Sequence, residues 1–197
     1  MKVSKQQATE NRERILVTAA RLFREGGIAG VGVDAVSEAA SLTHGSVYSQ
    51  FGSKDRLAAE ALSAGYAKAE IRGAAIATLH EFLTHYLSAQ HRDNRGSGCF
   101  MAALGGEMPR QTEGVRKTFT AIVKANIARI SQLMNPKRRS EDDDAVFVVA
   151  AMVGAMVLSR AVDEPGLSDR IIKATRRRLD PDIARTAKQD GRPKATA

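Results

Sequence analysis

The stretch SLTHGSVYSQFGSKDRL, from Ser41 to Leu57, places hydroxyl, glycine, aromatic and lysine residues between two segments that are apolar and rich in alanine. Within it, Val47 and Phe51 stand four residues apart, which puts both side chains on one face of an α-helix. The residues around them are small or polar. A core helix does not need this mixture, whereas a short helix that lies against a polyanion does.

The neighbouring segments extend this pattern to a helix-turn-helix. Residues 33–40 have the apolar spacing of a short helix, residues 41–43 form the turn, and residues 44–51 form a second short helix. An amphipathic helix precedes them and ends at Gly26 and Gly27. Two short helices joined by a three-residue turn are typical of DNA-binding proteins in which the second helix enters the major groove, which is ~12 Å wide.

The second of these helices carries side chains suited to duplex DNA. Thr43 can cap the helix and reach a phosphate, and the Tyr48 hydroxyl suits a phosphate oxygen. Lys54 stands at the N-terminus of the next helix, where free amides and the helix dipole attract anions. The small or polar residues between them can approach base edges. The predicted DNA-binding residues are Thr43, His44, Gly45, Ser46, Tyr48, Ser49, Gln50 and Lys54.

Each of these assignments has an ordinary alternative. Tyr48 could cover an edge of the core, and His44 and Lys54 could simply be solvated. The formal net charge of +8 suggests an anionic partner. However, residues 170–197 hold nine Lys and Arg against three acids, so most of the excess charge lies near the C-terminus and does not locate a DNA-binding face.

The rest of the chain is also predicted to be helical, because aromatic residues make up only 5%, Trp is absent and no strand pattern occurs. We expect an all-α fold with three parts: residues 1–53 as a helix-turn-helix DNA-binding domain, residues 54–179 as a helical effector-binding and dimerisation domain, and residues 180–197 as a basic, disordered tail. The expected helices cover residues 9–26, 33–40, 44–51, 54–73, 74–90, 99–108, 112–134, 142–163 and 165–179, with Thr9 and Ser53 as N-caps and Pro109 ending the sixth.

Several classes of protein are disfavoured by what the sequence lacks. It contains no nucleophile elbow, phosphate loop, dinucleotide fingerprint or metal-ligand cluster, so we expect neither an enzyme nor a bound cofactor or metal. His80, His85 and His91 lack suitable partners for zinc. The single cysteine, Cys99, excludes an internal disulfide, fits a reducing cytoplasm, and is expected to be a small buried hydrophobe. The apolar run at residues 145–158 is shorter than the ~20 residues that cross a bilayer, so no membrane partner is expected.

The segment from Arg12 to Leu62 resembles the DNA-binding domain of the tetracycline-repressor (TetR-type) family. The resemblance rests on ILVTAARLFREGGIAG, VDAVSEAASLTHGSVYSQF and SKDRL, which occur in the family's order and spacing. It implies an N-terminal three-helix DNA-binding domain followed by a helical domain that dimerises and often holds a small-molecule effector.

The sequence departs from that family at a few positions. Val31 and Gly32 stand where Ser or Thr usually caps the second helix and contacts phosphate, so Gly32 must serve as the cap. Ser41 replaces the turn glycine, and Gln50 replaces an aromatic residue or His. Because Gln can read adenine, these differences bear on the operator sequence more than on DNA binding itself.

We therefore expect a homodimeric, cytoplasmic repressor that binds a pseudo-palindromic operator and is released by an apolar or aromatic effector. Residues 145–158 and 165–179 are expected to form a four-helix bundle with their two-fold copies, or alternatively to be buried within one subunit. The alternatives are a helical ligand-binding protein with weakened DNA binding and a nonspecific DNA binder that uses its tail. Core packing explains the candidate effector contacts equally well: Tyr66, Phe82, Tyr86, Phe100, Met101, Met108 and Phe119.

Overall fold

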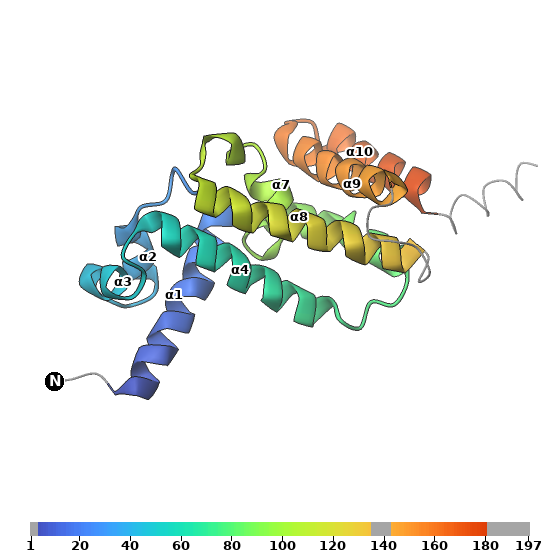
Figure 1. The fold of residues 1–197 in the computed structure, drawn as a ribbon. Coiled ribbons are helices and arrows are strands. Elements are labelled where there is room, and N and C mark those ends of the chain that lie inside the picture. Colours follow the sequence, from blue (N-terminus) through green and yellow to red (C-terminus); the bar gives the residue numbers. More distant parts are fainter. Residues whose placement is uncertain (1–3, 135–142, 181–197) are drawn as a thin grey trace, which may run out of the picture. The chain divides into compact units, whose positions relative to one another are not determined.

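A computed structural model describes residues 4–134 and 143–180, and within these ranges every regular element is a helix (Figure 1). This confirms the all-α fold class. Residues 135–142, which include most of the connection expected between the helices at residues 112–134 and 142–163, lie outside the described residues, as do residues 181–197 of the expected tail. The elements are α1 (Lys5–Gly26), α2 (Val33–Ala39), α3 (His44–Phe51), α4 (Lys54–Gly73), α5 (Leu79–Tyr86), α6 (Ala89–Asp93), η1 (Arg95–Ser97), α7 (Phe100–Leu104), η2 (Met108–Arg110), α8 (Glu113–Met134), α9 (Asp143–Ala161) and α10 (Pro165–Leu179).

The chain divides into two compact units. Within the described residues, the first contains residues 4–74 together with Asn94–Ala125, and the second contains Ala75–Asp93, residues 126–134 and residues 143–180. Helix α8 contributes its first part to one unit and its second part to the other. The domain boundaries expected at residues 53/54 and 179/180 remain a prediction.

The core of the first unit is built from the apolar faces of α1 and α4. Ile15, Ala19 and Phe23 recur at helical spacing on α1 and are fully buried, and Leu57 and Leu62 of α4 are equally buried in the same cluster. Burying one such side chain contributes roughly 1.5–3 kcal/mol. The helices α2 and α3 are held on this core by the further members Val36, Val47 and Phe51.

Helix α1 begins earlier than the sequence pattern indicates. Ser4 is its N-cap, because the Ser4 hydroxyl oxygen accepts a hydrogen bond from the amide of Gln7 at 3.1 Å. The prediction of Thr9 as the N-cap is wrong. Thr9 lies inside the helix, where its hydroxyl donates a hydrogen bond to the carbonyl oxygen of Lys5 at 3.1 Å. At the other end, Gly27 has φ = 78° and its amide donates to the carbonyl oxygen of Phe23. The expected stop at Gly27 is therefore confirmed.

The single helix expected over residues 74–90 is wrong. Thr78 and Glu81 form a capping box at the start of α5, and Leu87 ends this helix with φ = −89° and ψ = 62°. The prediction for residues 99–108 is also wrong, because α7 stops at Leu104 and Pro109 lies inside η2. Cys99 precedes α7 and is half-buried, not buried as expected.

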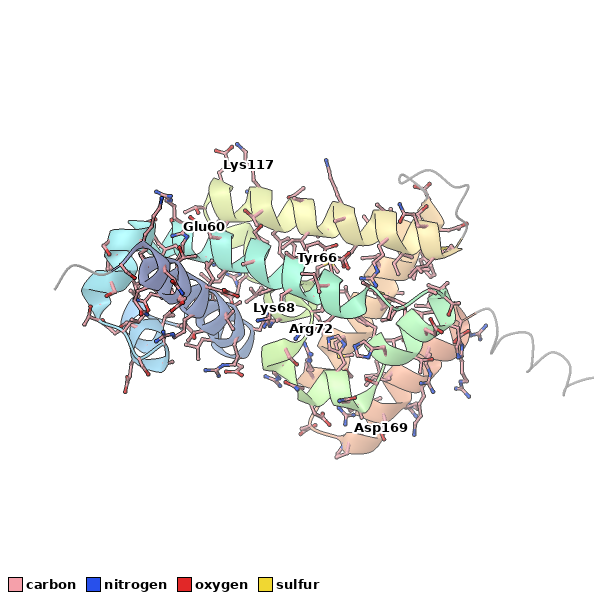
Figure 2. All side chains as sticks on the ribbon, turned by 90° about the horizontal axis from the view of Figure 1, so that it is seen from below. Glu60, Tyr66, Lys68, Arg72, Lys117 and Asp169 are labelled. Carbon is pink, nitrogen blue, oxygen red and sulfur yellow. The ribbon has the colours of Figure 1, made fainter. Side chains whose placement is uncertain are left out.

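In the second unit, charged side chains join α6 to α9 and α10. Arg160 of α9 donates to the carbonyl oxygens of His91 and Arg92 at 2.7 and 3.0 Å, which satisfies the C-terminal end of α6. Arg92 donates in turn to Asp169 near the start of α10, at 2.7 Å. Asp169 is labelled in Figure 2.

Two histidines of this unit, His80 and His91, have separate protein partners. Burial lowers the pKa of His91 to about 4, so its ring is neutral near pH 7 and its Nδ1–H donates to the carbonyl oxygen of Tyr86 at 2.7 Å. The Nδ1 of His80 lies 2.8 Å from a carboxylate oxygen of Asp180, a residue that the sequence assigns to the tail but that is fully buried. Among the described residues, no group of three potential ligands could hold a metal ion.

Helix α9 has one buried face and one exposed apolar face. Its 19 residues make it long and apolar enough to cross a membrane by length and composition, although the apolar run at residues 145–158 alone is shorter. The core helix of a globular protein passes the same test, and Val148, Met152 and Met156 of α9 are buried in the second unit. Length and composition are therefore only weak evidence that this helix spans a membrane.

The turn between α2 and α3 contains the one non-glycine residue with positive φ among the described residues, Ser41 at φ = 54°. A left-handed backbone costs an L-residue about 1–2 kcal/mol, which glycine avoids at a partly offsetting entropic cost. We expect Ser41→Gly to raise the free energy of unfolding by about 0.5 kcal/mol, measured by urea denaturation. Ser41→Ala is the control: it keeps the Cβ atom, and an equal gain in that variant would contradict the explanation.

Candidate DNA-binding surface

Helix α3 is short, and its orientation is fixed by its two buried side chains. Val47 and Phe51 are each 1% exposed and belong to the core of the first unit. Thr43 caps the helix, because its hydroxyl oxygen accepts a hydrogen bond from the amide of Ser46 at 3.3 Å. Gly52 ends the helix with φ = 73°. The caps and the buried face expected from the sequence are confirmed.

The structure places the sequence-predicted contact residues on α3, at its N-cap and at the start of α4. Together with Lys54, these residues form the side of α3 that does not pack against the core. The exposed members are Thr43, His44, Gly45, Tyr48 and Ser49, and the half-buried members are Ser46, Gln50 and Lys54. Tyr48 is 43% exposed, so its ring does not serve as a core side chain.

His44, the first residue of α3, is held by two neighbours. Its Nδ1 is hydrogen-bonded to a carboxylate oxygen of Asp34 in the first turn of α2, and its ring lies 4.7 Å from that of Tyr48. The remaining ring nitrogen, Nε2, is the one that can reach a ligand. The contact with Asp34 also ties the start of α3 to α2, which the sequence analysis did not anticipate.

Lys54 lies at the N-terminus of α4, as expected, and reaches back toward the loop that precedes α2. Its Nζ lies 3.4 Å from the carbonyl oxygen of Ala29. Ser53 caps α4 through a hydrogen bond from the amide of Arg56 at 3.2 Å. The side chain of Lys54 is therefore near the helix-turn-helix and not isolated in solvent.

Arg12 of α1 is a positioning residue that the sequence analysis missed. Its Nη1 donates to the carbonyl oxygen of Gln50 at 3.0 Å, and its guanidinium group lies 4.3 Å from the ring centroid of Phe51. The same guanidinium forms an ion pair with Glu60, which projects from α4 (Figure 2). Arg12, which lies on α1, thus joins the C-terminal end of α3 to α4.

The start of α2 differs from the family pattern in the expected way. Gly32 is the N-cap, with φ = −79° and ψ = 161°, and makes no side-chain hydrogen bond. Val31 is 8% exposed and belongs to the core, so it offers nothing to a phosphate. Gly32 and Val31 could therefore contact a phosphate only through their backbone amides.

Gly45 provides a direct test of how closely α3 approaches DNA. A Cβ atom added at Gly45 would meet no protein atom within 4 Å, and alanine favours a helix over glycine by about 0.5–1 kcal/mol. We expect Gly45→Ala to raise the free energy of unfolding by about that amount while weakening DNA binding by at least about tenfold, because the added methyl group meets the groove wall.

Gly114→Ala in α8 is the matched control, since a Cβ atom there also meets nothing within 4 Å. It should stabilise the fold without changing DNA affinity, as measured by fluorescence anisotropy. Unchanged affinity in Gly45→Ala would show that the start of α3 does not enter the groove.

Comparison with known proteins places this surface in context. Residues 15–61 match the family model of the bacterial regulatory proteins, tetR family. This range contains α2, α3 and the first part of α4, and hence every residue predicted to contact DNA. No curated protein sequence matches the chain at a significant level.

Solved structures share the fold over most of the chain. The reduced form of E. coli NemR is 21% identical, with a TM-score of 0.72 over 87% of this chain and 95% of its own. A TetR transcriptional regulator from Chloroflexus aurantiacus is 22% identical, with a TM-score of 0.72 over 89% and 97% of the two chains. AibR, solved in complex with isovaleryl coenzyme A and operator DNA, is 17% identical, with a TM-score of 0.60 over 87% and 98%. At these identities the likeness concerns the fold.

Proposed function

We propose that this chain is a DNA-binding transcriptional regulator of the TetR family, whose model residues 15–61 match, and that it is a homodimeric repressor that a small apolar or aromatic effector releases from a pseudo-palindromic operator. In this proposal the chain is a DNA-binding regulator and not an enzyme, which the match of residues 15–61 to that family supports. The proposed location is the cytoplasm, where operator DNA is accessible.

The observation that carries the proposal is the division of α3 into a buried and an exposed face. Val47 and Phe51 hold the helix on the core, while the exposed face presents a glycine, hydroxyl groups and Tyr48. In this proposal Thr43, Tyr48 and Lys54 contact phosphates and set the register on the duplex. The bases are approached by His44, Gly45, Ser46, Ser49 and Gln50.

Dimerisation is proposed through α9 and α10. Phe147 and Leu158 of α9 are 66% and 56% exposed, and the same face contains Val157, Ala150 and Gly154. An apolar stripe with small residues in its middle suits close packing against a second helix. A two-fold pair would present two α3 helices about 34–36 Å apart, one turn of DNA.

The effector is proposed to be apolar or aromatic because of the aromatic and methionine side chains expected to surround it. Phe100, Met101 and Met108 are buried in the first unit, where Tyr66 and Phe119 are partly buried. AibR, a protein of similar fold, has been solved with both an acyl-coenzyme A and operator DNA, which supports control by a small molecule. An effector can release DNA only if it binds the DNA-incompetent state more tightly.

The central test is sequence-specific binding. We expect the protein to select particular fragments from sheared genomic DNA and to bind them at least about 10³-fold more tightly than scrambled DNA at moderate salt. Gln50→Ala should reduce this preference by roughly tenfold or more, because a bidentate base contact is lost. Lys54→Ala should weaken binding to both DNAs and lower the salt slope by about one.

Tyr48→Phe tests the hydroxyl group alone, because it removes the hydroxyl and keeps the ring. We expect it to weaken binding to both DNAs by a similar factor. Equal affinity of the wild type for selected and scrambled DNA would contradict the repressor proposal. That result would favour a helical ligand-binding protein with weakened or nonspecific DNA binding, for which the missing hydroxyl at Val31 and Gly32 provides a reason.

The dimer interface makes a separate prediction. Phe147→Asp places a charge within the proposed interface, so we expect a shift from dimer to monomer in analytical ultracentrifugation, accompanied by loss of operator binding. Ile71→Asp is the control, because Ile71 is 76% exposed on α4 and lies outside the stripe. A Phe147→Asp protein that stays dimeric would place the interface elsewhere.

A further inference from the structure

The loop between α1 and α2 is held by a side chain that is distant in the sequence but belongs to the same unit. Glu107 lies between α7 and η2, and its Oε2 accepts hydrogen bonds from the amides of Ile28 and Ala29 at 3.0 and 3.2 Å. Hydrogen bonds to a carboxylate are roughly twice as strong as those between neutral groups. The loop that leads into the helix-turn-helix is therefore fixed from outside that motif.

The loop is shaped around this carboxylate. Gly27 has φ = 78°, and a Cβ atom at that position would lie 2.2 Å from the Oε1 of Glu107. Gly27 therefore ends α1 and leaves room for the carboxylate at the same time.

The same loop is connected to the proposed DNA contacts. While the amide of Ala29 donates to Glu107, its carbonyl oxygen lies 3.4 Å from the Nζ of Lys54. Ile28 is 3% exposed and Val31 8%, and both belong to the core cluster that also contains Met108 of η2. A displacement of η2 would therefore reach Lys54 and the start of α2 together.

The N-terminal end of α7 is seated against α1 and α4. Phe100 packs so closely on Gly65 that a Cβ atom there would lie 2.7 Å from its ring. The guanidinium group of Arg24 lies 4.3 Å from the centroid of the same ring. Burial is the main cause that lowers the pKa of Arg24 to about 10, which leaves it charged near pH 7. Helix α7 thus joins the middle of α4 to the loop before α2.

We propose that Glu107 is the positioning residue that couples α7 and η2 to the orientation of α2 and α3, so that the placement of α7 determines whether the recognition helix can bind DNA. This inference rests on the proposed function, in which Phe100, Met101 and Met108 are candidate effector contacts. An effector that moves these side chains would act on the loop through Glu107. Because coupling is reciprocal, DNA bound at α3 must also stabilise the Glu107 contact.

Reciprocity allows a test without the effector. The probe is the DNA fragment that the wild type selects from genomic DNA, and the readout is amide hydrogen exchange with and without that fragment. In the wild type we expect DNA to slow exchange in α3, at Ile28 and Ala29, and in the peptide that spans α7 and η2. In Glu107→Ala, exchange at Ile28 and Ala29 should be about tenfold faster, and DNA should protect α3 but no longer α7 and η2.

Glu107→Gln keeps an oxygen acceptor and should restore most of the protection of α7 and η2, which distinguishes loss of the contact from loss of fold. Glu113→Ala is the charge-matched control, since Glu113 begins α8 and its ion pair joins only Lys117, at 2.8 Å. It should behave as the wild type does.

Two outcomes would overturn the proposal in distinguishable ways. If DNA protects α3 of the wild type but leaves α7 and η2 unchanged, or if Glu107→Ala retains that protection, the coupling role of Glu107 is wrong while the DNA-binding function stands. If DNA fails to protect α3 of the wild type, the proposed function fails, and the inference fails with it.

Discussion

The burial of Val47 and Phe51 is the constraint on which the candidate DNA-binding surface depends. Helix α3 has eight residues, too few for an isolated helix to be stable in water, so its existence and direction come from packing on the core. The packing of these two residues therefore determines the position of every side chain on the exposed face of α3. Arg12 reinforces the arrangement, because its guanidinium contacts the Phe51 ring and the backbone of Gln50 while pairing with Glu60.

The sequence predicts this part of the fold well because its signals are local. Thr43, Gly52 and Ser53 each act within a few residues of a helix end, and the period of the apolar residues gives the buried face. The errors arose where local signals competed. Continuous apolar spacing across residues 74–90 concealed the capping box of Thr78 and Glu81, although both residues are visible in the sequence.

The contacts that fix the helix-turn-helix could not be predicted in the same way. Arg12 and Glu60 are 48 residues apart, and the amide of Ile28 and Glu107 are 79 residues apart. Before folding, each of these charged side chains looks like any other solvent-exposed residue, because no periodicity marks its partner. The same holds for Asp34 and His44. The sequence therefore indicates which residues form the exposed face of α3, whereas the structure is needed to identify those that hold them in place.

For helix α9, amino-acid composition alone does not predict which environment surrounds the helix. Its apolar residues fit a buried core helix, a membrane span or a subunit interface equally well, because each of these environments selects for the same side chains. The structure adds the contacts that each face of the helix makes. Met152 and Met156 are buried, and Arg160 at the end of the helix donates to backbone carbonyls of α6, which ties one face to the second unit. The opposite face, with Phe147 and Leu158, remains exposed, and the proposed dimer interface rests on this observation.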